Sequence, residues 1–91
     1  MATPAQVAND MIAQARYFKG RDKAIFKACT DAARVIRLHL DGQKVDGRTY
    51  GGLHHRLVDM EMSSRASYFA VRSNLTRARI TLEQLHREAT R

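Results

Sequence analysis

The sequence predicts an all-α protein: a small helical bundle made of a helical hairpin and one long C-terminal helix, with a break in that helix as the alternative. Hydrophobic residues recur at intervals of three and four along almost the whole chain, which is typical of one face of an α-helix. Strand-like alternation is nearly absent, and proline occurs only at position 4. The 91 residues leave room for a single helical domain, 1–91, with a thin core.

The first helix is predicted over residues 4–19. Thr3 is suited to cap it, Pro4 fits its first position, and Gln6 stands where a capping box requires it. The hydrophobic face then consists of Val7, Met11, Ala15 and Phe18. Gly20 follows as a residue that ends helices.

The second helix is predicted over residues 22–41, with Asp22 as its cap. Its hydrophobic face consists of Ile25, Cys29, Ala32, Ala33, Ile36 and Leu40. Gly42 ends it, as Gly20 ends the first. Because the link between these two helices is so short, we expect them to form an antiparallel hairpin.

Residues 43–51 are predicted to be a loop. The stretch QKVDGRTYGG, residues 43–52, contains three of the five glycines. A helical pattern then runs over residues 52–88 without glycine or proline after its first position. Its main hydrophobic stripe consists of Leu53, Leu57, Met60, Ser64, Ser67, Val71, Leu75, Ala78, Leu82 and Leu85. The predicted place for a break is Ser73-Asn74, because both residues can cap a new helix.

A second, thinner hydrophobic stripe lies on the opposite side of this predicted helix. It consists of Val58, Met62, Phe69 and Ile80. A helix that is hydrophobic on two sides needs two partners. The hairpin would be one and a second copy of the chain the other, so we expect a homodimer with this stripe as its oligomer interface. The alternative is a four-helix monomer in which the C-terminal half folds back.

Positive charge is the strongest functional signal. Lys and Arg number 16 against nine Asp and Glu, so the formal net charge is +7. Such an excess favours a polyanionic partner, either nucleic acid or an acidic protein surface. The candidate binding residues of the hairpin are Arg16, Tyr17, Lys19, Arg21, Lys23, Lys27, Arg34 and Arg37. Tyr17 falls outside the hydrophobic face, and an exposed aromatic ring among cations is suited to stacking on a base, although protein interfaces use the same residue types.

A second candidate site lies in DGRTYGGLHHRLVDM, residues 46–60. A glycine pair that leads into a helix offers free backbone N–H groups to a phosphate. Arg48, His54, His55 and Arg56 would add positive charge around it. The stretch is equally explained as a flexible loop followed by the first turn of a helix.

Catalysis and metal binding find no support in the sequence. His55 and Asp59 have the spacing of a ligand pair, but no third ligand is spaced to match. No nucleophile motif or nucleotide-binding loop is present. We therefore expect no enzyme activity, no cofactor and no metal.

The single cysteine, Cys29, indicates a reducing compartment and a role as a small core residue. The first residues lack a signal-peptide pattern, and no hydrophobic run is long enough to span a membrane. We expect a cytoplasmic protein without membrane contact. Together these observations favour a regulatory or accessory nucleic-acid-binding protein of the size met in phages and plasmids, with a protein-interaction module, such as an adaptor or inhibitor, as the alternative.

Overall fold

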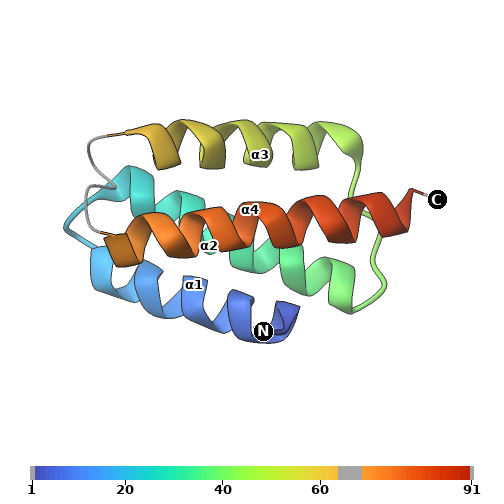
Figure 1. Cartoon of the computed structure of the whole chain (residues 1–91), viewed down its shortest axis with the longest axis horizontal. Coiled ribbons are helices and arrows are strands. Elements are labelled where there is room, and N and C mark those ends of the chain that lie inside the picture. The colour runs from blue at the N-terminus through green and yellow to red at the C-terminus, as the bar shows by residue number, and fades with distance from the viewer. Residues whose placement is uncertain (1, 64–68, 91) are drawn as a thin grey trace.

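The computed structural model describes residues 2–63 and 69–90, which form four helices in up-and-down order (Figure 1). The helices are α1 (Pro4–Phe18), α2 (Lys23–Leu40), α3 (Gly47–Met62) and α4 (Phe69–Ala89). The described residues contain no strand, and the predicted all-α bundle is confirmed. Helix α4 contacts all three other helices and completes the bundle from within the chain. None of the helices within the described ranges is both long and hydrophobic enough to cross a membrane.

The hairpin of α1 and α2 forms as predicted, and its helix ends agree with the sequence to within one residue. Thr3 and Gln6 make the expected capping box: the Thr3 hydroxyl accepts from the Gln6 backbone N–H, and the Thr3 N–H donates to Oε1 of Gln6. Asp22 caps α2 by accepting from the N–H groups of Ala24 and Ile25. Gly20, at φ +79°, supplies the left-handed backbone of the turn.

The predicted loop at 43–51 is wrong in its second half, because α3 begins at Gly47. Asp46 caps this helix: its carboxylate accepts from the Thr49 N–H at 2.7 Å and from the Thr49 hydroxyl at 3.1 Å. These bonds also lower the pKa of Asp46. The cap offsets the poor helix propensity of Gly47, Gly51 and Gly52, which is what made the stretch look like a loop.

The continuous helix predicted over residues 52–88 is also wrong. Helix α3 ends at Met62 with Ser63 as its C-cap, and α4 begins at Phe69. The break therefore precedes the predicted position, and Ser73 and Asn74 lie inside α4. Two members of the predicted main stripe, Ser64 and Ser67, fall outside the described residues.

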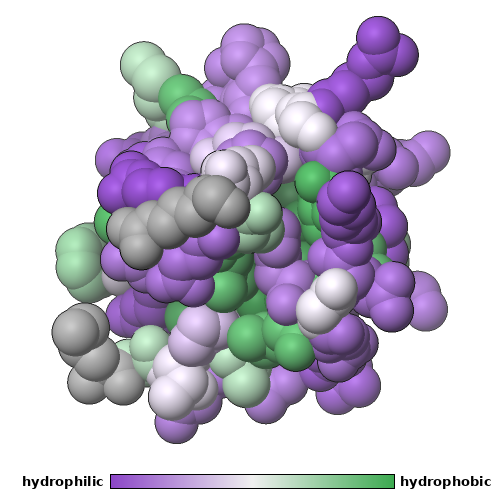
Figure 2. All heavy atoms as spheres, turned by 90° about the vertical axis from the view of Figure 1, so that its right-hand side faces the viewer, coloured by the Kyte–Doolittle hydropathy of each residue, from purple (hydrophilic) through white to green (hydrophobic). Residues whose placement is uncertain are grey.

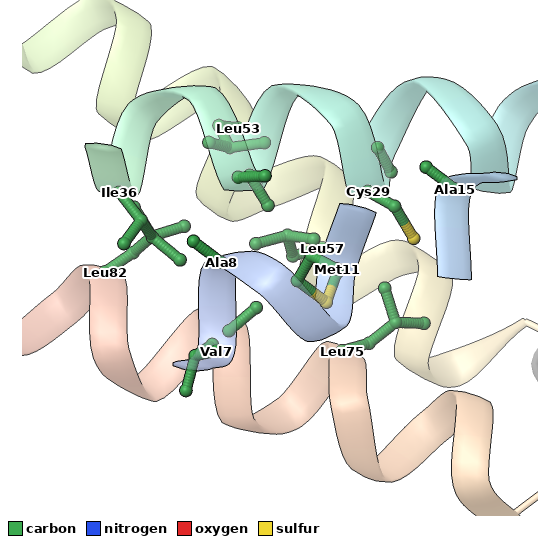
Figure 3. Close-up of a cluster of buried hydrophobic side chains, with 14 of the residues drawn as sticks. Val7, Ala8, Met11, Ala15, Cys29, Ile36, Leu53, Leu57, Leu75 and Leu82 are labelled. Carbon is green, nitrogen blue, oxygen red and sulfur yellow. The ribbon is translucent and has the colours of Figure 1, made fainter. Parts of the chain in front are cut away.

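The core is built from one face of each helix (Figure 3). Helix α1 contributes Val7 and Met11, α2 contributes Cys29 and Ile36, and the predicted main stripe supplies six of the 18 buried hydrophobic residues. The buried members of this stripe are Leu53, Leu57, Val71, Leu75, Ala78 and Leu82. Cys29 is a buried free thiol, as the sequence suggested, and burial raises its pKa. From the end that holds the N-terminus of α3, the surface is mainly hydrophilic, with hydrophobic residues in small separate patches (Figure 2).

Two glycines weaken the middle of α3. Gly51 and Gly52 are exposed, and a Cβ atom placed on either would meet no other atom within 4 Å. We expect Gly51→Ala to raise the free energy of unfolding by about 0.5–1 kcal/mol, because alanine loses less backbone entropy in a helix. Urea denaturation followed by circular dichroism measures this. Gly20→Ala is the matched control and should instead destabilise by about 1 kcal/mol, because Gly20 has a positive φ. Equal effects at both positions would contradict the explanation.

Candidate nucleic-acid interface

The turn between α1 and α2 carries the densest group of exposed cations in the described structure. Five of them define what we call the basic end: Arg16, Lys19, Arg21, Lys23 and Lys27. The stripe continues along the outer face of α2 with Arg34 and Arg37, both exposed. Residues 16–37 hold seven of the 16 Lys and Arg but only two of the nine acidic residues. The hairpin residues predicted from sequence thus lie on two connected elements.

Tyr17 is exposed beside these cations, as predicted, with 60% of its surface accessible. The guanidinium carbon of Arg21 lies 4.6 Å from the centre of its ring, which is a cation–π contact. The ring also meets Phe18 edge to face at 4.9 Å between centroids. These two contacts hold an aromatic ring at the surface in a defined position.

Most carboxylates of the described residues form ion pairs with arginine or histidine side chains of α3 and α4. Asp31 of α2 pairs with Arg56 of α3 at 2.9 Å, and Asp10 of α1 lies 3.8 Å from Arg77 of α4. Asp22 and Asp46 cap helices. Among the described residues, no carboxylate forms an ion pair with any cation of the basic end or with Arg34. The seven cations of residues 16–37 therefore exceed the two carboxylates in the same stretch, Asp22 and Asp31, and the ion pairs of the described residues do not neutralise this excess.

The four candidates from residues 46–60 are not brought to the basic end, because the start of α3 lies at the opposite end of the bundle (Figure 1). His54 and Arg56 instead form ion pairs with other helices: His54 with Glu83 of α4 and Arg56 with Asp31 of α2. Exposed His55 lies 3.3 Å from Asp59, the spacing noted in the sequence. The predicted phosphate cradle at the glycine pair is wrong: Gly51 and Gly52 lie within α3, where their N–H groups take part in the helix.

Helices α3 and α4 are joined by a network centred on Arg79. Its guanidinium donates to both carboxylate oxygens of Glu61, at 3.2 and 3.0 Å, and to Glu83 at 3.0 Å. His54 Nε2 lies 2.7 Å from the same oxygen of Glu83. The pKa of Glu83 is lowered, first by the hydrogen bond from His54 and then by Arg79, against the opposing effect of burial. Arg79 therefore links one carboxylate on α3 with one on its own helix.

An aromatic and imidazole cluster at the other end of the bundle was not foreseen. Tyr50 stacks on His86 with 3.9 Å between ring centroids and 6° between planes, and His39 approaches His86 edge to face. His39 Nε2 and His86 Nδ1 are buried without a hydrogen-bond partner in the described part of the chain. Burial, and secondly the charge of His86, lower the pKa of His39. Within residues 2–63 and 69–90, no three potential ligands are grouped to hold a metal ion.

Sequence reasoning also missed a hollow between α1 and α4 that borders Tyr17. Its lining residues are Asp10, Ala13, Gln14, Tyr17, Phe18, Val71 and Asn74. Asp10, Ala13 and Tyr17 are spaced by three and four, so helical spacing alone places them on one face of α1. The α4 side was not, because nothing in the sequence pairs Asn74 with Gln14.

Comparison with known proteins leaves the interface to be interpreted on its own chemistry. No protein-family model matches the chain, and no curated protein or solved structure shows significant similarity to it.

Proposed function

We propose that this protein binds nucleic acid through the basic end and the outer face of α2, by contacts to phosphates and without catalysis. The observation that carries the proposal is the excess of seven exposed cations over two carboxylates in residues 16–37. Free cations next to an exposed aromatic ring match the composition of nucleic-acid-binding surfaces. The protein would act as a cytoplasmic regulatory or accessory factor, of a size common in phages and plasmids.

The dimensions suit a polyanion. From Lys23 to Arg37 the stripe on α2 is about 21 Å long, at ~1.5 Å per residue, which is enough to follow several phosphates. Arg37 also donates to the side-chain oxygen of Asn9, a neutral partner that leaves its charge available. Contacts of this kind position a protein on a backbone and carry no sequence information directly.

Fluorescence anisotropy tests the proposal, with labelled mixed-sequence duplex DNA and single-stranded RNA titrated from low to moderate salt. We expect affinity to fall steeply with salt, with a log–log slope of several units, because each phosphate contact releases counterions. Absence of binding at low salt would overturn the proposal.

A matched pair of variants locates the surface. Changing Arg16, Lys19 and Lys23 to glutamine should lower the affinity at least about tenfold and reduce the salt slope by about 2–3. The control changes Lys44, Arg72 and Arg87 to glutamine, which removes the same charge from exposed positions elsewhere. If both variants lose equal affinity, the net charge and not the basic end is responsible.

A protein-interaction role is the second candidate, because the predicted oligomer interface leaves large hydrophobic side chains in solvent. Met62 is 81% exposed, Phe69 87% and Ile80 43%, and Val58 is half-buried. At about 100° per residue, these positions fall on the outer sides of α3 and α4. Exposed hydrophobic groups of this kind mark interaction sites.

Either a second copy of the chain or another protein would cover these hydrophobic side chains. Light scattering distinguishes them: a dimer mass that Phe69→Glu reduces to a monomer mass indicates self-association. If the wild-type protein has a monomer mass and also binds no nucleic acid in the anisotropy experiment, another protein is favoured as its partner.

A further inference from the structure

We propose that the hollow between α1 and α4 binds one unpaired nucleobase that carries an exocyclic amino group, while the phosphates of the same strand lie on the basic end. The inference rests on the proposed function and extends it, because it names single-stranded nucleic acid as the ligand class. Four side chains would act on the base: Tyr17, Asp10, Gln14 and Asn74, all of which line the hollow.

Tyr17 connects the hollow to the basic end. Its ring lines the hollow, and it is in contact with Arg21, the central cation of the turn. Arg21 lies over one face of this ring, so the tyrosine is held in place before any ligand arrives. Stacking of a base on such a ring is the usual way in which proteins hold single strands, and every base has a face that can stack.

Two amides form a fixed polar wall on the inner side. Gln14 is buried, donates to the Cys29 sulfur at 3.2 Å and accepts from Asn74 Nδ2 at 2.9 Å. These bonds leave the Oδ1 atom of Asn74 and one of its N–H groups for a ligand. A donor and an acceptor side by side match the hydrogen-bonding edge of an unpaired base.

Asp10 supplies a carboxylate at the rim, half-exposed and 3.8 Å from Arg77. That distance is long for a hydrogen bond, so acceptor sites on the carboxylate remain open. Carboxylates accept from the amino group of cytosine, whereas thymine presents a carbonyl oxygen at the same position. The hollow should therefore prefer cytosine over thymine and, by the same argument, favour other bases with an amino group.

Single-stranded DNA decamers of one base test this in the same anisotropy assay, at about 50 mM salt where phosphate contacts are strong. The dC decamer should bind at least about fivefold more tightly than the dT decamer, because cytosine presents an amino group where thymine presents a carbonyl oxygen, while the phosphates of the two strands are the same. A decamer without bases should bind more weakly than both. Duplex DNA should gain nothing from the hollow, because its bases are already stacked and paired.

Variants assign the effect to the hollow. Tyr17→Ala should weaken binding of the dC decamer about tenfold, and Tyr17→Phe should retain it, because phenylalanine keeps the ring. Asp10→Asn should bring the ratio between dC and dT affinities close to one. The control is Asp41→Asn, which removes the same charge from an exposed position of the α2 C-cap and should leave that ratio unchanged.

The two proposals fail in different ways. If all decamers bind equally, the abasic strand included, and Tyr17→Ala changes nothing, then the base site is wrong and phosphate binding at the basic end stands. If no nucleic acid binds at low salt, the proposed function is wrong and the base site falls with it.

Discussion

Replacing Leu57 by alanine is expected to lower the free energy of unfolding by about 3 kcal/mol, the typical cost of truncating a fully buried leucine. Leu57 is wholly inaccessible, and it and Leu53 are the residues that α3 buries. A protein of this size has a total stability of about 5–13 kcal/mol. The change would therefore remove a large part of it and lower the melting temperature by about 15 °C.

Thermal and urea unfolding of Leu57→Ala measure this effect, and Met62→Ala is its control. Met62 lies on the same helix but is 81% exposed, so its truncation should change the stability by less than about 0.5 kcal/mol. A large loss for Met62→Ala would show that this methionine is covered in solution, which would support an interface at the exposed hydrophobic face. A small loss for Leu57→Ala would contradict the packing of α3.

Replacing Arg79 by methionine should cost about 2 kcal/mol, because it leaves two carboxylates without their cation. Glu61 is only 13% exposed and Glu83 30%, so each would lose its charged partner in a poorly solvated position. Removal of one partner from a fully buried pair costs more than this, and exposure reduces the cost here. Glu61→Gln in the Arg79→Met background should recover part of the loss.

The pH dependence of the free energy of unfolding of Arg79→Met gives an independent check. The pKa of Glu83 is lower in the folded protein than in the unfolded chain, so its stabilisation is complete above the unfolded pKa. It is lost as the pH falls below about 4.3, the usual value for glutamate, toward the folded pKa. Without Arg79 the pKa of Glu83 is lowered less, so its protonation costs less stability. The stability gap between wild type and Arg79→Met should therefore narrow on acidification, and a constant gap would contradict the charge explanation.

The hairpin could be predicted almost to the residue because its signals are local. A capping box, two glycines and hydrophobic spacing all act within a few positions of one another. The second half of the chain was harder for a physical reason. The hydrophobic stripe of α3 continues in phase into that of α4, so periodicity alone indicated one helix, and the sequence between Ser63 and Phe69 contains no glycine or proline that would signal a break.

The residues of the candidate site were likewise predictable where local spacing determines them, and not where contacts between distant residues do. The cations and Tyr17 could be placed on exposed faces from helical spacing alone. Contacts between distant residues could not, which is why Arg56 and His54 were assigned to a binding surface although they pair with Asp31 and Glu83. The stacking of Tyr50 on His86 and the hydrogen bond between Gln14 and Asn74 likewise join residues far apart in the chain.

The thin attachment of α3 has a consequence for how the protein moves. Helix α3 buries only Leu53 and Leu57 and has Gly51 and Gly52 in its interior, whereas each of the other three helices buries at least five residues. Partial opening of a fold begins at its least stable cooperative unit. Amide hydrogens of α3 should therefore exchange with solvent by a sub-global opening that leaves α1, α2 and α4 associated around Met11, Leu75 and Leu82. The bundle would then unfold as two cooperative units: α3, which opens and closes reversibly, and the three-helix unit of α1, α2 and α4, which stays folded while α3 is open.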